Sequence, residues 1–205
     1  MKTMTVEQLY DKLCSKAFQD PKNGDLHYNY FMFQYDATKE YDMLRQIDDI
    51  REKIRRPNNN VDVLLLDLFE EFTAFLDNRS FGKKWNSYKE YLINKEQTMK
   101  DAVQNSLRDL ANSDEFINYL HERIMKHVEK VEDGMIRPYV FVYGVGNMFP
   151  YLRVNNLLVR YEGQNMSSRY KLIIFYPGEQ QDNTYKLFGK LEDYHTYRAS
   201  LLLNE

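Results

Sequence analysis

Residues 137–178 read RPYVFVYGVGNMFPYLRVNNLLVRYEGQNMSSRYKLIIFYPG, and this stretch decides the fold. It contains two short apolar runs, Tyr139–Tyr143 and Leu172–Tyr176, whose aromatic and β-branched residues are typical of buried strands. We expect each run to end in a turn that contains glycine, at Gly144 and at Gly178. The residues between the runs indicate one amphipathic helix. This order of strand, loop, helix and strand predicts a parallel α/β unit, with its functional loops at the carboxyl ends of the strands.

The same alternation runs through the N-terminal two thirds of the chain. Hydrophobic residues at helical spacing alternate with short apolar runs, and Pro, Asn or Gly separates them. Thr5 is expected to cap the first helix, and Asp67 the helix after the second strand. We predict strands over residues 28–35 and 61–68 and helices over residues 4–18, 40–56, 69–76, 98–110 and 113–131, whereas residues 78–96 fit neither pattern.

The C-terminal part of the chain contains fewer predicted elements. Residues 185–191 indicate one edge strand or extended arm after the Pro177-Gly178 turn. The chain is therefore predicted to be α/β, a single domain over residues 1–205 with a mostly parallel central sheet flanked by helices. Its layering is expected to be Rossmann-like or NTPase-like without a phosphate loop. We divide it into an N-terminal helix (1–20), a core (28–178) and a C-terminal edge strand and arm (179–205).

Composition excludes several classes of protein. The chain has 205 residues, of which 43% are hydrophobic and 29% charged, and its formal net charge is −3, which argues against a dedicated nucleic-acid binder. Its one cysteine, Cys14, fits a reducing cytoplasm, and we expect neither a signal peptide nor a membrane span. The 17 Tyr and 12 Phe serve either as amphipathic core residues or as anchors of an interface.

The glycine pair Gly144 and Gly146 resembles the start of a dinucleotide-binding turn. The third glycine of that motif is missing, because Met148, Phe149 and Pro150 fill its window, and no Walker-type phosphate loop occurs in the chain. Two interpretations remain. Either glycine is needed for the dihedral angles of a tight turn, or the backbone N–H groups together with Arg153 hold an anion or a partner's carboxylate.

Catalytic and metal-binding patterns are weak in this chain. His121 and His127 share a predicted helix, but a spacing of six residues places them about 240° apart around its axis, so they do not chelate one ion together. His195 follows Asp193 closely and could act as a base, although a surface or structural role is expected. Cys14 has no histidine near it in sequence. We predict no catalytic residue, no metal site and no cofactor.

Two carboxylates follow predicted strands. Asp36 and Asp67 are expected at the same edge of the sheet as the Gly144 turn and Pro177. An acidic residue in that position is familiar from NTPase sheets, but without a phosphate loop the pair has no assigned chemistry.

Several short motifs follow one another in the C-terminal part of the chain. They are Gly144-Val145-Gly146, Pro150, Arg153, Leu157-Leu158, Tyr176-Pro177-Gly178, Leu187-Phe188-Gly189 and Tyr197-Arg198-Ala199. Their order resembles the BrxB family of BREX phage-defence systems, whose pattern is a G-V-G turn, a proline and an arginine ahead of a leucine pair, then a P-G turn, an L-F-G motif and a terminal Y-R-A motif. The terminal motif departs from the family, because Thr196 stands where an aromatic residue is frequent.

The resemblance implies a component of a bacterial system that modifies host DNA and blocks phage replication. The other components of such systems include a methyltransferase, a large ATPase and PglZ, an alkaline-phosphatase-like protein. The family has no established enzymatic activity and is suspected to contact PglZ. The implied function is thus that of a non-catalytic scaffold, with no membrane partner and an open oligomeric state.

The predicted contact residues for a partner or an anion are Gly144, Gly146, Arg153, Pro177, Gly178 and Arg198. The alternative for Arg153 and Arg198 is that they bridge the glycine turn to the C-terminal segment within this chain. The alternative function is a degenerate nucleotide-binding or nucleic-acid-sensing module, although direct contact with nucleic acid is not the expectation. A hydrolase that uses His195 and Asp193 is a third and weaker reading.

Overall fold

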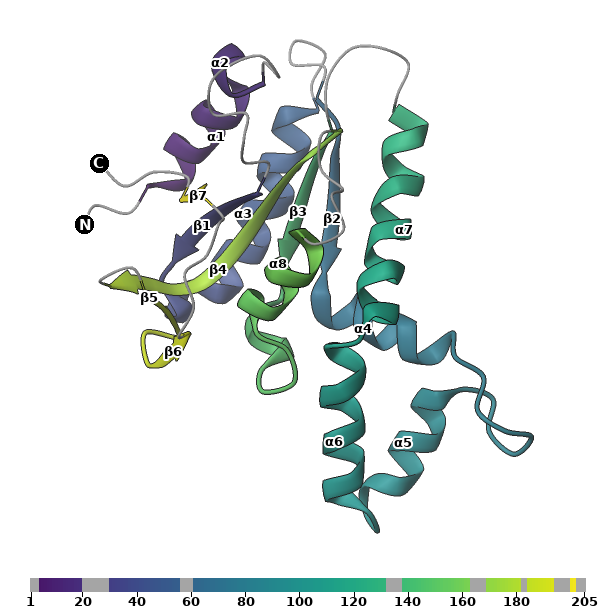
Figure 1. Ribbon diagram of the computed structural model, residues 1–205. Helices are drawn as coiled ribbons and strands as arrows, with labels where there is room; N and C mark the ends of the chain where they lie inside the picture. Colours follow the sequence, from purple (N-terminus) through teal and green to yellow (C-terminus); the bar gives the residue numbers. More distant parts are fainter. Residues whose placement is uncertain are drawn as a thin grey trace.

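The computed structural model describes residues 4–19, 30–55, 61–131, 138–162, 169–181, 184–193 and 200–201 (Figure 1). Its central sheet contains β1 (Tyr30–Tyr35), β2 (Val63–Asp67), β3 (Tyr139–Tyr143), β4 (Lys171–Gln181) and β7 (Ser200–Leu201). The strand order is β2-β3-β4-β1-β7, and every pair in it is parallel. The central strand is β4, and β1 and β3 on its two sides are apolar runs because both faces of the sheet are covered.

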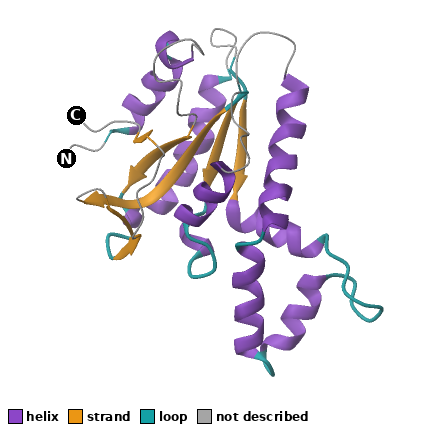
Figure 2. Ribbon diagram, in the orientation of Figure 1, coloured by secondary structure: helices purple, strands orange, loops and turns teal. Residues whose placement is uncertain are grey.

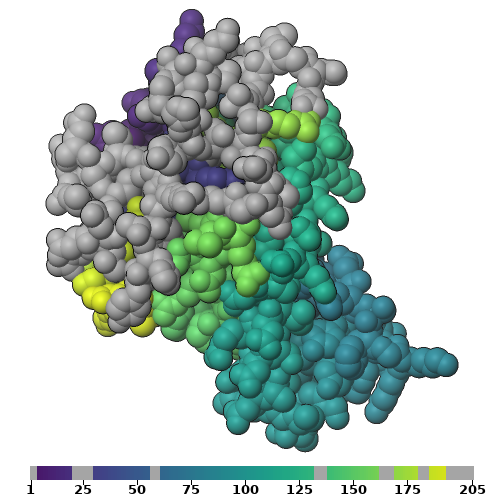
Figure 3. All heavy atoms as spheres, in the orientation of Figure 1, coloured from purple at the N-terminus to yellow at the C-terminus, as the bar shows by residue number. Residues whose placement is uncertain are grey.

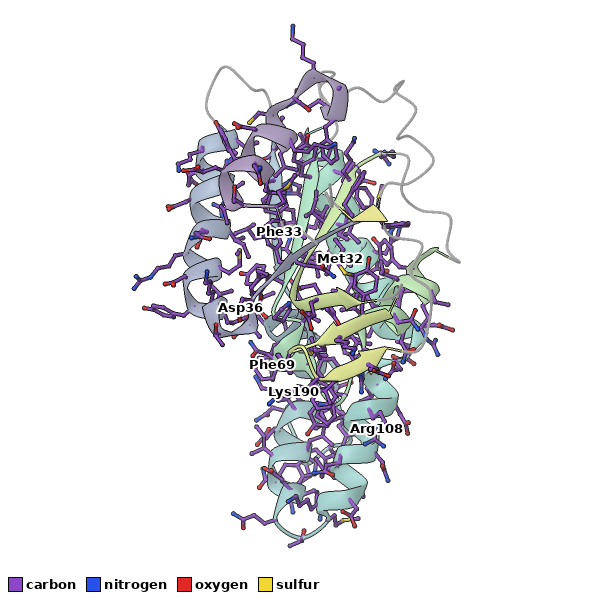
Figure 4. The ribbon with its side chains drawn as sticks, turned by 90° about the vertical axis from the view of Figure 1, so that its left-hand side faces the viewer. Met32, Phe33, Asp36, Phe69, Arg108 and Lys190 are labelled. Carbon is purple, nitrogen blue, oxygen red and sulfur yellow. The ribbon has the colours of Figure 1, made fainter. Side chains whose placement is uncertain are left out.

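Helices cover the two faces of the sheet (Figure 2). One face packs against α1 (Val6–Cys14), α2 (Lys16–Gln19) and α3 (Glu40–Ile54). The other packs against α4 (Leu68–Asp77), α7 (Asp114–Val131) and α8 (Val154–Glu162). The connection from β1 to β2 runs toward one edge of the sheet and the later connections run back, so right-handed crossovers place α3 opposite the other helices. Met32 and Phe33 point to opposite sides of the sheet accordingly (Figure 4).

The long connection between β2 and β3 contains α4 to α7. Its two middle helices, α5 (Tyr88–Glu96) and α6 (Lys100–Ala111), extend beyond the carboxyl ends of the strands (Figure 1). We call α5, α6 and the loop before them (residues 78–87) the helical lobe. The helices on either side of the lobe, α4 and α7, are joined by a cluster of aromatic rings, in which Phe72 and Phe75 of α4 lie 5.1 and 5.3 Å from Phe116 of α7. The predicted helices of this region are confirmed, and α5 is a helix that the sequence pattern did not reveal.

The N-terminal helix is two helices rather than the single one predicted over 4–18. Thr5 caps α1 in a capping box with Gln8, as expected for this residue. The break comes at Ser15, whose backbone is extended and whose hydroxyl oxygen accepts a hydrogen bond from the N–H of Phe18, at 3.2 Å. A serine side chain that bonds to nearby backbone groups competes with the helix. The buried Lys171 ammonium then donates to the Phe18 carbonyl oxygen and ties α2 to β4.

The C-terminal part differs most from expectation. Pro177 and Gly178 do not form a turn, because β4 continues through them to Gln181 and pairs antiparallel with β5 (Thr184–Leu187). The predicted single edge strand is a hairpin of β5 and β6 (Leu191–Asp193). Buried Tyr185 and Leu187 hold this hairpin against the core and so extend the sheet beyond Tyr176.

The expected α/β class, with a sheet flanked by helices, is confirmed. The expectation of a mostly parallel sheet is confirmed in part, because β5 and β6 are antiparallel additions. The extent of the domain over residues 1–205 stays a prediction. Across the described parts of the chain, no helix is both long enough and apolar enough to span a membrane.

Candidate functional site at the carboxyl ends of the strands

The carboxyl ends of β1, β2 and β3 lie at one edge of the sheet together with Pro177 of β4, as predicted. Tyr35 at the end of β1 is in register with Pro177 of β4, and Asp67 at the end of β2 is in register with Tyr143 of β3. Asp36 and the Gly144 turn follow directly. In an open α/β sheet this edge is where ligands are held.

The end of β1 has carboxylates where a phosphate loop would stand. Asp36 accepts hydrogen bonds from the N–H and the hydroxyl of Thr38, at 2.9 and 2.8 Å, and so caps the short helix η2 (Ala37–Lys39). The backbone hydrogen bond from Thr38 lowers the pKa of Asp36. The buried Tyr35 hydroxyl donates to Glu40 in the first turn of α3, and desolvation together with this acceptor raises the pKa of Tyr35. The partial positive charge of the helix N-terminus thus faces acidic side chains of the chain itself.

The end of β2 also carries a carboxylate that caps the following helix. Asp67 Oδ1 accepts hydrogen bonds from the N–H groups of Phe69 and Glu70, at 2.9 and 3.3 Å, and therefore caps α4 as predicted. Gly144 crosses directly over this carboxylate with a φ of +71°, and a Cβ placed on it would lie 2.5 Å from Asp67 Oδ1. Glycine is needed here for its dihedral angle and for its missing side chain.

The second glycine of the pair lies under an aromatic ring. Gly146 begins the short helix η3 (Gly146–Met148), and a Cβ on it would lie 2.8 Å from Cε1 of Phe188. Phe188 is in the turn between β5 and β6, and its N–H donates to the Pro177 carbonyl oxygen, at 2.8 Å. The Gly144-Val145-Gly146 turn is therefore packed against the rest of the chain on both sides.

Gly178 is required by a backbone contact. A Cβ on Gly178 would lie 2.1 Å from the carbonyl oxygen of Lys186 on β5. The close approach of β4 and β5 explains this glycine, which we had expected in a turn, and Pro177 precedes it on the same strand. These two residues shape the hairpin.

Arg153 contacts its own chain at this edge. Its guanidinium carbon lies 5.0 Å from the ring centre of Phe149, and its Nη1 donates to the Glu192 carbonyl oxygen on β6, at 3.4 Å. This geometry agrees with the alternative in which Arg153 bridges the glycine turn to the C-terminal segment. Arg198 and His195 lie outside the described residues.

Carboxylates and phenols at this edge are groups that could ligate a metal or exchange a proton. Within the described segments, no cluster of three or more His, Cys, Asp and Glu residues has the geometry of a metal site. The phenols nearest to the hairpin are buried, and burial raises the pKa of Tyr185 to about 12. The structure brings the predicted glycines and Arg153 to the same edge of the sheet, where they contact other residues of this chain.

The edge does expose a mixed aromatic and charged surface. Phe69 is 45% exposed and Phe188 is 39% exposed, although large apolar side chains at these positions would be expected in the core. Asp36 and Lys190 are exposed with them, and Asp36, Phe69 and Lys190 lie at the same end of the sheet (Figure 4). We call Asp36, Phe69, Phe188 and Lys190 the strand-end surface.

Sequence reasoning missed most of this surface. Phe69 was assigned to a helix without a role, and Lys190 carried no signal. Phe188 was visible only as part of the L-F-G motif, where a bulky residue directly before glycine could have indicated an exposed turn.

Comparisons with known proteins agree with the motif pattern. A family model described as "BREX protein BrxB" matches residues 64–202, a range that includes every motif from Gly144 to Ala199. A protein of Bacillus cereus (strain H3081.97) named BREX protein BrxB is 21% identical over 205 residues, which cover 98% of this chain and 96% of that protein. No solved structure matches. The chain therefore belongs to the BrxB family of BREX proteins.

Proposed function

We propose that this chain is a non-catalytic scaffold of a BREX anti-phage assembly in the bacterial cytoplasm, and that its strand-end surface contacts a PglZ-type component. One observation carries the proposal. The positions at which an α/β enzyme would hold its ligand are occupied by the chain's own groups: Asp67 under Gly144, Phe188 over Gly146, and Arg153 against β6.

What remains exposed at this edge suits a protein partner. Aromatic residues are enriched at protein interfaces, where a few of them supply most of the binding energy inside a polar rim. Phe69 and Phe188 can act as such anchors, and Asp36 and Lys190 place one charge of each sign beside them. A partner with an apolar pocket and complementary charges would fit this surface.

Co-purification tests the proposal. The tagged chain is expressed together with the neighbouring genes of its system, and the proteins retained with it are identified. The variant Phe69→Ser with Lys190→Glu is expected to lose the PglZ-type component with little change in melting temperature, because both side chains are exposed.

A matched control variant changes one apolar residue and one lysine on α8 and α7, away from the strand-end surface. Val159, which is 60% exposed on α8, and Lys126, which is exposed on α7, allow the double variant Val159→Ser with Lys126→Glu. This control changes polarity and charge equally and is expected to retain the partner. Retention of the partner by both variants would remove the strand-end surface from the proposal.

The degenerate nucleotide-binding function is less well supported. The helices after β1 and β2 carry acidic residues in their first turns, Glu40 and Asp42 in α3 and Glu70 and Glu71 in α4, which disfavour a phosphate there. We expect no rise in melting temperature with ATP or GTP. A clear rise with either nucleotide would favour that function over the scaffold.

A further inference from the structure

The loop between α4 and α5 projects from the helical lobe. It comprises residues 78–87, with the sequence NRSFGKKWNS, and we call it the tip loop. It extends away from the rest of the molecule at the lower right of Figure 1 and forms a protrusion in Figure 3. Its base is closed by the N–H of Tyr88, which donates to the Arg79 carbonyl oxygen at 2.7 Å.

The tip loop has a defined shape. Phe81 and Trp85 form an antiparallel bridge around the three residues between them, and Gly82 takes a φ of +64° in the resulting turn. The Phe81 ring lies 4.2 Å from the ring of Tyr91 on α5, and the Trp85 ring lies 6.1 Å from it. These aromatic contacts hold the turn on the helix, so its outer residues are presented to solvent.

The outer residues carry positive charge. Residues 78–87 include Arg79, Lys83 and Lys84 and no carboxylate. Arg79 is paired with Glu115 on α7, whereas the exposed Lys83 and Lys84 have no ion pair with any described residue. The Lys84 ammonium lies 4.9 Å from the Trp85 ring. The tip loop thus presents two exposed lysines, one of which lies beside an aromatic ring.

We infer that the tip loop binds a single-stranded nucleic acid, with Lys83 and Lys84 on the phosphates and Trp85 and Phe81 against the bases. Lysine is depleted from protein interfaces, but it pairs readily with phosphate as a point charge. Proteins that bind single strands combine positive charge along the backbone with aromatic rings on which bases stack. The tip loop has both within a few residues.

The chain's overall charge limits this binding. With a formal net charge of −3, attraction to a nucleic acid is local to the tip loop, and binding is weak and falls with salt. This inference does not depend on the scaffold function, because the tip loop belongs to the helical lobe and shares no residue with the strand-end surface.

Tryptophan fluorescence tests the inference at the loop itself, because Trp85 is the one tryptophan of the chain. The probe is oligodeoxythymidylate of about 20 nucleotides, long enough to span the site size of one binding module. At low salt we expect it to quench the emission of Trp85, and added salt to reverse the quenching.

The variant Lys83→Ala with Lys84→Ala is expected to bind at least about fivefold more weakly than the unaltered chain. It is also expected to reduce the slope of log affinity against log salt by about 1.4, or about 0.7 for each lost phosphate contact. Its melting temperature should be unchanged. The control Lys53→Ala with Lys126→Ala removes two exposed lysines from α3 and α7 and is expected to bind as the unaltered chain does.

Three results would overturn the inference. One is the absence of quenching at low salt. Another is equal weakening by the tip-loop variant and the control, which would mean diffuse charge attraction. The third is equal quenching by polyglutamate of the same charge, which would assign the lysines to an acidic protein partner.

Discussion

The ring of Phe188 lies on the backbone of Gly146, 2.8 Å from where a Cβ would stand. Phe188 reaches this position with a φ of +56°, a conformation that costs a non-glycine residue about 1 to 2 kcal/mol. The packed ring and the hydrogen bond from its N–H to Pro177 offset that cost. The G-V-G and L-F-G motifs are thus two sides of one contact, which locks the β5–β6 hairpin onto the glycine turn.

Gly144→Ala should be strongly destabilising. The left-handed φ costs about 1 to 2 kcal/mol for alanine, and crowding against Asp67 weakens the cap of α4, which is worth about another 1 to 2 kcal/mol. We expect a loss of about 2 to 4 kcal/mol in the free energy of unfolding, measured with urea.

The background Asp67→Ala separates these two costs. It removes the cap and the crowding together, so Gly144→Ala in that background should cost only the strain of the backbone. An equal cost in both backgrounds would mean that Asp67 and Gly144 do not interact as described.

Gly178→Ala should disrupt the hairpin more severely than a glycine substitution in open space. Its Cβ would meet the backbone oxygen of Lys186 at 2.1 Å, and a backbone atom of a paired strand has little room to move. Gly82→Ala is the control, because Gly82 has a positive φ but no atom within 4 Å of a Cβ, so it should cost only about 1 to 2 kcal/mol. Hydrogen exchange over residues 184–193 should rise sharply for Gly178→Ala alone. Protection of the hairpin in that variant would contradict the β4–β5 geometry.

Arg153→Ala distinguishes an internal bridge from a partner contact. Loss of the hydrogen bond to Glu192 and of the stack on Phe149 should destabilise the chain by about 0.5 to 1.5 kcal/mol and speed amide exchange in β6. Arg153→Lys keeps the charge but not the planar guanidinium, so its effect should be intermediate. Unchanged stability and exchange, combined with loss of the partner, would instead assign Arg153 to the interface.

Stability should fall below neutral pH because of two histidines on α7. Burial lowers the pKa of His121 and of His127, and for His127 the carboxylate of Asp62, 3.2 Å away, opposes this only in part. The charged groups that act on the two rings are Asp62, Arg55, Arg123, Lys130 and Glu122.

Because the folded-state pKa lies below the unfolded value of about 6.5, the unfolded chain binds more protons in the interval between the two. The free energy of unfolding is therefore highest above about pH 6.5, falls as the pH drops through this interval, and levels off with respect to these groups below it. The variant His121→Gln with His127→Gln should flatten the fall in urea titrations at successive pH values. An unchanged slope would show that other groups titrate there.

The sequence was sufficient for features that local chemistry decides. Thr5 and Asp67 were expected to cap their helices, and each side chain accepts the bond from a backbone N–H that such a cap requires. The continuous apolar runs of β1, β2 and β3 likewise indicated strands buried on both faces, because periodicity and composition are visible within a few residues.

The sequence was insufficient where distant segments decide the structure. Gly178 was placed in a turn because Pro-Gly is common in turns, yet the strand partner supplied by Tyr185 and Leu187 keeps the chain extended through it. The roles of Gly144 and Gly146 depend on Asp67 and Phe188, which are 77 and 42 residues away in sequence. No local pattern could distinguish these contacts from a phosphate-binding turn.

The Gly144-Val145-Gly146 turn and the β5–β6 hairpin lock each other in place, and a double-mutant cycle on Gly146 and Phe188 tests this contact most directly. Gly146→Ala alone should cost about 1 to 3 kcal/mol, since its Cβ overpacks the ring. In the background Phe188→Ala the same change should be close to neutral, because the space is open and Gly146 has no positive φ. A coupling of at least about 1 kcal/mol is the predicted result. Additive costs, or a stable Gly146→Ala variant that has lost a ligand or partner, would contradict this mutual locking.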